Sequence, residues 1–356
     1  MASDQQPIRE LEARLGCNWV AIRGAQEATA NQHDVLNGAF KGKIAHDTSV
    51  VLFGSIAREE VTSGSDADWI LLVDGQAVPE HENQRRDVAE ILNANNFGRP
   101  GRSGVFGSMV GSHSLVHEIG GEDDTNSNTT RRILLLLESL AVGDDTAAHT
   151  RVRQQILSRY LEDDNGLLYG KGPFRVPRFL LNDVTRYWRT ITVDFVYKQR
   201  SDAGGKWALR NAKLRLSRKL VFTSGLLRCF FCHLDPTAED ARRDLANNND
   251  PTKLAAYMES ELSATPLQLL ARAAGRPSVP QSTAKLLFDS YDGFLGLLDN
   301  QQARTELTDL RPHDVGKSEV WSQIRKLGRD FQEGLTSLFF GDDKELRALM
   351  IEYGVF

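Results

Sequence analysis

The sequence predicts an α+β fold in which a small domain containing a sheet precedes a larger all-helical domain. Two apolar runs bounded by turn residues, residues 47–53 and 66–73, have the composition of buried strands. From residue 126 onward, long helical patterns follow one another, with Pro, Gly and Asn clusters between them. We therefore expect a first domain over residues 1–125 and a helical domain over residues 126–356.

The elements of the first domain follow from local patterns. Residues 7–30 have the pattern of an opening helix, and residues 54–60 are typical of a short helix between the two strands. Residues 81–96 predict a further helix, and a third strand is expected near residues 115–119, after a Gly- and Arg-rich segment. The helices expected in the second domain cover residues 126–162, 177–200, 205–234, 251–275, 279–300 and 315–341.

Composition excludes several classes of protein. The 356 residues are 40% hydrophobic and 26% charged, and no stretch approaches the roughly 20 consecutive apolar residues of a membrane span. The N-terminus has no apolar signal region, so we expect a cytoplasmic protein. A net charge of −5 gives no broad nucleic-acid-binding surface, although residues 175–228 are locally basic. The oligomeric state stays open, and a homo-oligomer is compatible with the sequence.

The three cysteines are too few for a disulfide framework. Cys229 and Cys232, followed by His233, have the spacing of half a zinc site, but a structural zinc site needs four ligands and no second pair follows. Because they lie in an apolar helical run, we expect both thiols to be packed in the core.

Two aspartates stand at the start of the second predicted strand. Residues two apart on a strand point to the same face, with about 6.6 Å between their Cα atoms, so Asp66 and Asp68 are expected to project together. Two carboxylates this close repel each other unless a cation lies between them. Mg²⁺, with Mn²⁺ as an alternative, suits carboxylate oxygens and leaves coordination positions for phosphates. The pair therefore predicts a site for two divalent metal ions, as in two-metal-ion catalysis.

A Gly-Ser pair lies between the first strand and the expected short helix. Gly54 lets the backbone approach a ligand closely, and the hydroxyl of Ser55 adds a donor. A helix N-terminus at this point would present unpaired N–H groups to an anion. Phosphate binding is the predicted role of this turn.

Together these motifs resemble those of the nucleotidyltransferases of the DNA polymerase β superfamily, a resemblance that implies a mixed sheet. In that superfamily Gly-Ser, an Arg three residues after the Ser, and Ser-Asp-x-Asp recur, and here these are Gly54, Ser55, Arg58, Ser65, Asp66 and Asp68. The resemblance implies that the first four of these residues contribute to nucleotide binding. Glu59, where Gly is common, and Trp69, where Leu is common, depart from the pattern.

The resemblance also implies a third carboxylate on a neighbouring strand. The segment from Leu115 to Asn128 offers Glu118 and Asp124 about equally, with Glu122 and Asp123 as weaker candidates. Glu118 has apolar neighbours of the kind found on a buried strand. Asp124 lies in a polar turn, where its alternative role is to cap the helix that follows.

A cationic stripe is predicted in the helical domain. On a helix from Lys206, the residues Lys206, Arg210 and Lys213 fall within about 60° of one another, whereas Arg215, Arg218 and Lys219 turn toward solvent. Since apolar residues border the stripe, it is expected to meet an anion: the acids of the first domain or a nucleotide triphosphate. In the resembling superfamily, such cations bind the β and γ phosphates.

The leading hypothesis is a Mg²⁺-dependent nucleotidyltransferase that uses an NTP or dNTP and releases pyrophosphate. Over residues 45–230 the chain is also similar to bacterial nucleotidyltransferases with a helical extension, grouped beside the protein-PII uridylyltransferases, and to antiphage-defence synthases, including the Hailong type, that make a nucleotide or oligonucleotide signal for a membrane effector. Two alternatives are nucleotidylation of a protein or RNA, as in toxin–antitoxin pairs or nitrogen-signal regulators, and a catalytically silent scaffold.

Overall fold

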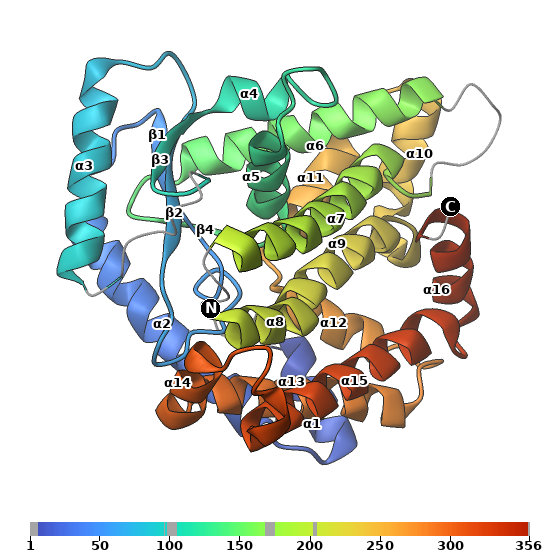
Figure 1. Ribbon diagram of the computed structural model, residues 1–356. Helices are drawn as coiled ribbons and strands as arrows, with labels where there is room; N and C mark the ends of the chain where they lie inside the picture. Colours follow the sequence, from blue (N-terminus) through green and yellow to red (C-terminus); the bar gives the residue numbers. More distant parts are fainter. Residues whose placement is uncertain (1–5, 96, 98–104, 168–174, 202–204, 355–356) are drawn as a thin grey trace.

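The computed structural model describes residues 6–95, 97, 105–167, 175–201 and 205–354, and it places a four-stranded sheet among helices (Figure 1). The strands are β1 (Thr48–Phe53), β2 (Asp68–Val73), β3 (Ser108–Gly111) and β4 (Ser139–Val142). They lie in the order β3-β2-β1-β4, with β1 antiparallel to β2 and β4, and β2 parallel to β3. The predicted α+β class with a mixed sheet is confirmed.

The sheet is buried on both faces, which explains why β1 and β2 are nearly continuous apolar runs. Val50 and Leu71 belong to a smaller core that includes residues of α2 (Val20–Phe40) and α3 (Pro79–Ala94). Val51 and Ile70 point to the opposite face and join the large core of the helical part. Figure 1 shows the sheet between α3 on one side and α5, α6 and α7 on the other.

The remaining helices begin with α1 (Gln6–Leu15) and α4 (Ser112–Val116). The helical part then contains α5 (Asn126–Leu137), α6 (Ala147–Leu167), α7 (Arg178–Ser201), α8 (Trp207–Arg215), α9 (Ser217–Leu234), α10 (Glu239–Asn248), α11 (Thr252–Glu261), α12 (Pro266–Ala274), α13 (Gln281–Asp299), α14 (Gln301–Asp309), α15 (Glu319–Phe340) and α16 (Lys344–Leu349). A π-helical turn, Met350–Gly354, ends the described chain. None of the helices in the described segments is both long enough and apolar enough to cross a membrane.

Two predictions for the first domain were wrong. The expected helix over residues 7–30 is divided, because α1 ends before Gly16, whose φ of +61° breaks the helical path. The third strand lies before the predicted residues 115–119, and residues 112–116 form α4 instead. Short apolar runs do not distinguish a strand from a helix by periodicity, and this ambiguity explains the second error.

Three long helices predicted in the second part are interrupted, and the one expected over residues 251–275 is divided into α11 and α12. The expected helix over residues 126–162 contains β4, so the sheet takes its fourth strand from beyond residue 125, and the division at that residue stays a prediction. The expected helix over residues 205–234 is broken at Leu216, where φ is −119° and ψ is −78°. Cys229 and Cys232 are fully buried in α9, which confirms that their thiols are packed in the core.

Candidate functional site

A cavity of about 610 Å³ opens where the ends of β1 and β2 face the helical part. Nine of the predicted site residues line it: Gly54, Ser55, Arg58, Ser65, Asp66, Asp68, Lys206, Arg210 and Lys213. Residues of α13 and α14, including Phe294 and Arg304, complete the wall. The fold therefore brings together segments separated by more than 200 positions in the sequence.

The Gly-Ser segment forms a tight turn after β1, and the short helix expected over residues 54–60 is absent from it. Gly54 has a φ of +79°, and a Cβ atom there would meet nothing within 4 Å, so the backbone conformation and not the available space favours glycine. The turn is closed by hydrogen bonds from the Arg58 amide to the Gly54 carbonyl (3.1 Å) and from the Glu60 amide to the Ser55 carbonyl (2.8 Å). Glu59 adopts a φ of +58°, which explains why the resembling superfamily commonly has Gly at this position.

The two aspartates reach the cavity from the start of β2. Asp68 is the first residue of that strand and lies opposite Phe53 of β1, while Asp66 precedes the strand and is exposed. The loop before them is fixed by Ser65, whose hydroxyl accepts a hydrogen bond from the Thr62 amide at 3.0 Å. Ser65 therefore supports the loop in addition to lining the cavity.

The electrostatics of the pair fit a divalent cation. Burial, and then the negative charge of Asp66, raise the pKa of Asp68 to about 6. A cation between the two carboxylates would relieve both effects. Within the described residues no group of three or more His, Cys, Asp or Glu side chains is placed to hold a metal, so Asp66 and Asp68 would be the protein ligands and phosphate or water would supply the rest.

Arg58 belongs to a buried ion-pair network beneath the turn. Its Nε donates to Glu60 at 2.8 Å and its Nη1 donates to Glu138 at 2.5 Å. The hydroxyl of Tyr291 on α13 donates to the second oxygen of Glu60 at 2.8 Å. Through these bonds the Arg58 guanidinium holds the turn in place. The sequence motif did not indicate this role.

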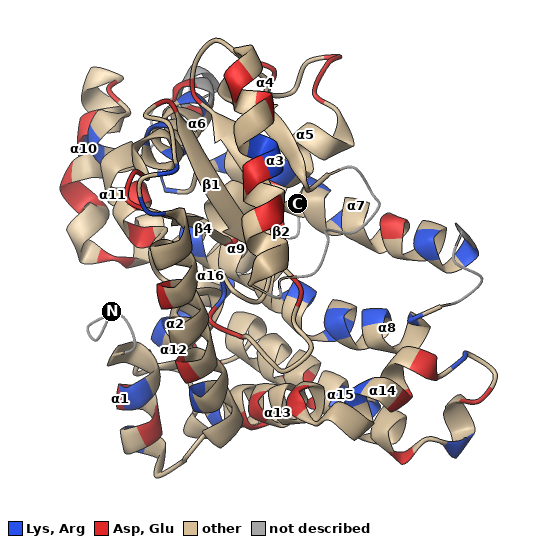
Figure 2. Ribbon diagram, turned by 90° about the vertical axis from the view of Figure 1, so that its left-hand side faces the viewer, with Lys and Arg blue, Asp and Glu red and all other residues tan. Residues whose placement is uncertain are grey.

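The cationic wall of the cavity consists of Lys206, Arg210 and Lys213, at the start of and along α8. Lys206 and Arg210 lie at the start of α8, and Lys213 follows on its last turn; Figure 2 shows the blue residues along α8 beside the end of α7. Burial lowers the pKa of Lys213 to about 8, against the opposing effect of Asp66. Among the described residues, none accepts a hydrogen bond from the Lys213 ammonium group. Lys213 is half-buried and only the charge of Asp66 offsets its desolvation, so an anion in the cavity would stabilise its ammonium group further.

Arg218 was predicted on the solvent side, and the structure corrects this. The break at Leu216 rotates α9 relative to α8, so that Arg218 lines the cavity. Its Nη1 donates to Glu138 at 2.7 Å. The burial of Glu138 and the position of Arg218 at the cavity depend on β4 and on the helix break, neither of which the sequence pattern indicated.

A second cation that the sequence analysis missed is Arg304 on α14. It lines the cavity, donates to the Thr62 hydroxyl at 3.2 Å, and bonds the Gly64 carbonyl. These contacts fasten the helical part to the loop that carries Asp66. A single Arg in a polar helical pattern does not predict that its side chain reaches the cavity.

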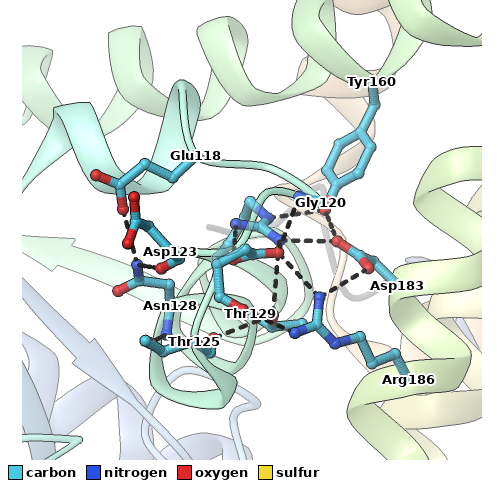
Figure 3. A network of polar contacts seen from close by, with 11 residues as sticks. Glu118, Gly120, Asp123, Thr125, Asn128, Thr129, Tyr160, Asp183 and Arg186 are labelled. Carbon is cyan, nitrogen blue, oxygen red and sulfur yellow. Dashed lines mark hydrogen bonds and ion pairs between the residues drawn. The ribbon is translucent and has the colours of Figure 1, made fainter.

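The structure does not bring Glu118 and Asp124 to the cavity, which corrects the prediction of a third carboxylate there. Figure 3 shows the network of polar contacts that includes Glu118, Asp183 and Arg186. Asp124 accepts two hydrogen bonds from Arg132, at 3.0 and 2.8 Å, and one from Arg186 at 2.9 Å. Glu118 follows α4 outside any strand and accepts from the Asn128 amide at 3.2 Å.

The weaker candidates do not line the cavity either: Glu122 and Asp123 are exposed in the turn before α5. Asp124 does not cap α5, since the N-cap is Thr125, whose hydroxyl accepts from the Asn128 amide. The predicted strand at residues 115–119 was the basis for placing Glu118 at the site, and that strand is absent.

Comparison with known families agrees with the geometry. Residues 35–100 match the model of the nucleotidyltransferase domain. Over these residues the chain is similar to a nucleotidyltransferase domain. The match to this domain spans β1, the Gly-Ser turn, both aspartates and α3, and it ends before β3 and the helical wall. A comparison with curated proteins finds no match.

Proposed function

We propose that the protein is a Mg²⁺-dependent nucleotidyltransferase that moves a nucleoside monophosphate from an NTP or dNTP to a hydroxyl acceptor. The observation that carries the proposal is the meeting of three features in one cavity: the Asp66–Asp68 pair, the Gly54–Ser55 turn and the unpartnered Lys213 ammonium group. The nucleotidyltransferase domain accounts for the first two, and the helical part contributes the third.

Different residues of the cavity would bind different parts of a metal-bound triphosphate. The turn and the Ser55 hydroxyl lie where hydrogen bonds to phosphate oxygens form. Lys213, with Arg210 and Lys206 toward the exposed end of α8, provides positive charge for the β and γ phosphates. Asp66 and Asp68 would hold Mg²⁺, or Mn²⁺, which when bound offsets the charge of the phosphates.

The reaction is a displacement at the α-phosphorus. The bond from the acceptor oxygen to that phosphorus forms, the bond to the bridging oxygen of pyrophosphate breaks, and the acceptor hydroxyl loses its proton. Such chemistry depends mainly on positioning and on charge neutralisation. The cationic side chains that line the cavity with the acid pair support this proposal, because they would offset the charge that accumulates on a leaving pyrophosphate.

For the biological role, we propose the synthesis of a nucleotide or oligonucleotide signal in bacterial antiphage defence, read by a membrane effector. The support is the wider sequence resemblance over residues 45–230. A gene for a membrane protein beside this one would strengthen the proposal. Transfer to a protein or RNA acceptor is the alternative.

Incubation of the purified protein with each α-labelled NTP and dNTP, in Mg²⁺ or Mn²⁺, tests the proposal. Free cyclic or linear products identify a signal synthase, whereas label on the protein, or label that appears only with added RNA, identifies macromolecular modification. Lys213→Met is expected to weaken triphosphate binding by about tenfold or more, whereas Lys326→Met, at an exposed position on α15, leaves it unchanged. Nucleotide binding without transfer to any acceptor would identify a scaffold.

A further inference from the structure

A second cavity, of about 360 Å³, lies behind the phosphate-binding turn. Ile56 and Ala57 of the turn line it, while their neighbours Ser55 and Arg58 line the catalytic cavity. The two cavities have no lining residue in common among the described residues. The other walls come from α2, β4, the start of α6 and the segment before α12. A volume of this size lies within the range of small-molecule sites in proteins.

The amide of Gln26 points to a ligand in this cavity. Gln26 lies on α2, lines the cavity and is only 6% exposed. Within the described part of the chain its side chain makes no hydrogen bond. The amide atoms of Gln26 are not among the solvent-excluded polar atoms that lack a partner, so solvent reaches them through the cavity and a bound molecule could take its place.

Among the further polar groups that line the cavity, Thr146, Thr150 and His149 are uncharged. The hydroxyls of Thr146 and Thr150 make no hydrogen bond to described residues, and both line the cavity. His149 is buried, and its Nε2 lies 2.8 Å from the Ser139 hydroxyl. Burial, with the nearby charge of Arg153, lowers the pKa of His149 well below its ordinary value, so its ring is neutral.

The charges of the lining favour an uncharged ligand. Arg153 is matched by Glu259, with Nη2 and Oε1 at 2.5 Å, and Glu138 is matched by Arg58 and Arg218. The lining residues that the structure describes therefore offer no positive charge in excess, and a phosphate or carboxylate would be desolvated here without compensation.

The remaining walls are apolar, with Leu140, Leu262 and Pro266 among them. Apolar walls combined with neutral donors and acceptors suit a flat heterocycle. A glutamine amide presents a donor and an acceptor side by side, which is the geometry that pairs with the edge of a nucleobase. We propose that this second cavity binds an uncharged nucleobase, free or as a nucleoside, with Gln26 hydrogen-bonded to the edge of the base.

Isothermal titration calorimetry of the full chain with adenine, adenosine, guanosine, cytidine, uridine and AMP, each at about 1 mM, tests the proposal. We expect at least one uncharged compound to bind, and Gln26→Leu to weaken that binding by about tenfold. Gln32→Leu, on the same helix but outside the cavity, should bind like the wild type. Thr150→Val, which removes a hydroxyl without a partner and conserves side-chain volume, is a second variant that should weaken binding and still fold.

Three results would overturn the proposal: binding by none of the uncharged compounds, equal binding by wild type, Gln26→Leu and Thr150→Val, or tighter Gln26-dependent binding of AMP than of adenosine. The double variant Asp66→Ala, Asp68→Ala should still bind the nucleoside. This variant separates the proposal from the proposed function, because the calorimetric signal requires neither metal nor turnover. A comparison of adenine with adenosine tells whether the ribose is accommodated.

Discussion

Glu138 joins two arginines from distant parts of the chain: Arg218 donates to one carboxylate oxygen at 2.7 Å and Arg58 to the other at 2.5 Å. Arg58 comes from the turn after β1 and Arg218 from the start of α9, and both line the candidate catalytic cavity. Hydrogen bonds from both arginines outweigh the effect of burial, so the pKa of Glu138 lies below its ordinary value. Glu138 is therefore a positioning residue that couples the nucleotidyltransferase domain to the helical part.

Glu138→Gln should destabilise the fold. It removes one negative charge from a buried network and leaves Arg58 and Arg218 with only Glu60 as a matched acid, for which a loss of about 3–5 kcal/mol in the free energy of unfolding is typical. Urea denaturation followed by circular dichroism measures the change. Glu162→Gln, at an exposed position of α6, is the control. A Glu138→Gln variant as stable as that control would refute the coupling role.

Nucleotide affinity should fall at alkaline pH. The pKa of Lys213 is lowered to about 8, so its ammonium group is charged below that pH and progressively neutral above it. Binding of an unreactive triphosphate analogue in Ca²⁺ is therefore expected to weaken by about tenfold between pH 7 and pH 9. In Lys213→Arg the guanidinium stays charged, and the pH dependence should flatten. An unchanged profile in this variant would mean that another group titrates.

Asp124→Asn distinguishes a structural from a catalytic acid. Because Asp124 is paired with Arg132 and Arg186 outside the cavity, the substitution should lower the free energy of unfolding by about 3 kcal/mol. Turnover per folded molecule should stay within about twofold of the wild type. Asp123→Asn, at the exposed neighbouring position, should alter neither quantity. A loss of turnover by orders of magnitude in folded Asp124→Asn would restore it as a catalytic candidate.

The pairing of Asp124 also predicts that the free energy of unfolding decreases at acidic pH. Burial favours a higher pKa for Asp124, but hydrogen bonds from Arg132 and Gly120 hold it below its ordinary value. Its stabilising contribution is complete above the unfolded-state pKa of about 3.9 and is lost as the pH falls through the lower folded-state pKa. Denaturation midpoints measured between about pH 6 and pH 3 should fall less steeply for Asp124→Asn than for the wild type. Equal slopes would contradict this assignment.

The sequence predicted those parts of the site that depend on local order. Gly54, Ser55, Asp66 and Asp68 lie within fifteen positions, and a strand-turn-strand pattern is enough to bring them to one cavity. The row from Lys206 to Lys213 was also predictable, because helical periodicity alone sets its direction.

The parts that depend on tertiary context were not predictable. Glu138 follows four consecutive leucines, where helix and strand patterns cannot be distinguished, and its role appears only when β4 joins the sheet beside β1. Arg218 points to the cavity because of the break at Leu216, and Arg304 reaches it from α14. Glu118 was placed in the site on the assumption of a strand that the chain does not form.

Pyrophosphate release from the full set of NTPs and dNTPs with Mg²⁺ tests the central claim most directly, when wild type is compared with the double variant Asp66→Ala, Asp68→Ala. We expect release by the wild type, and a loss of at least about a thousandfold in a variant whose circular dichroism and denaturation midpoint are unchanged. Undiminished release by the folded variant would contradict the assignment of these aspartates as the metal-binding centre of the reaction.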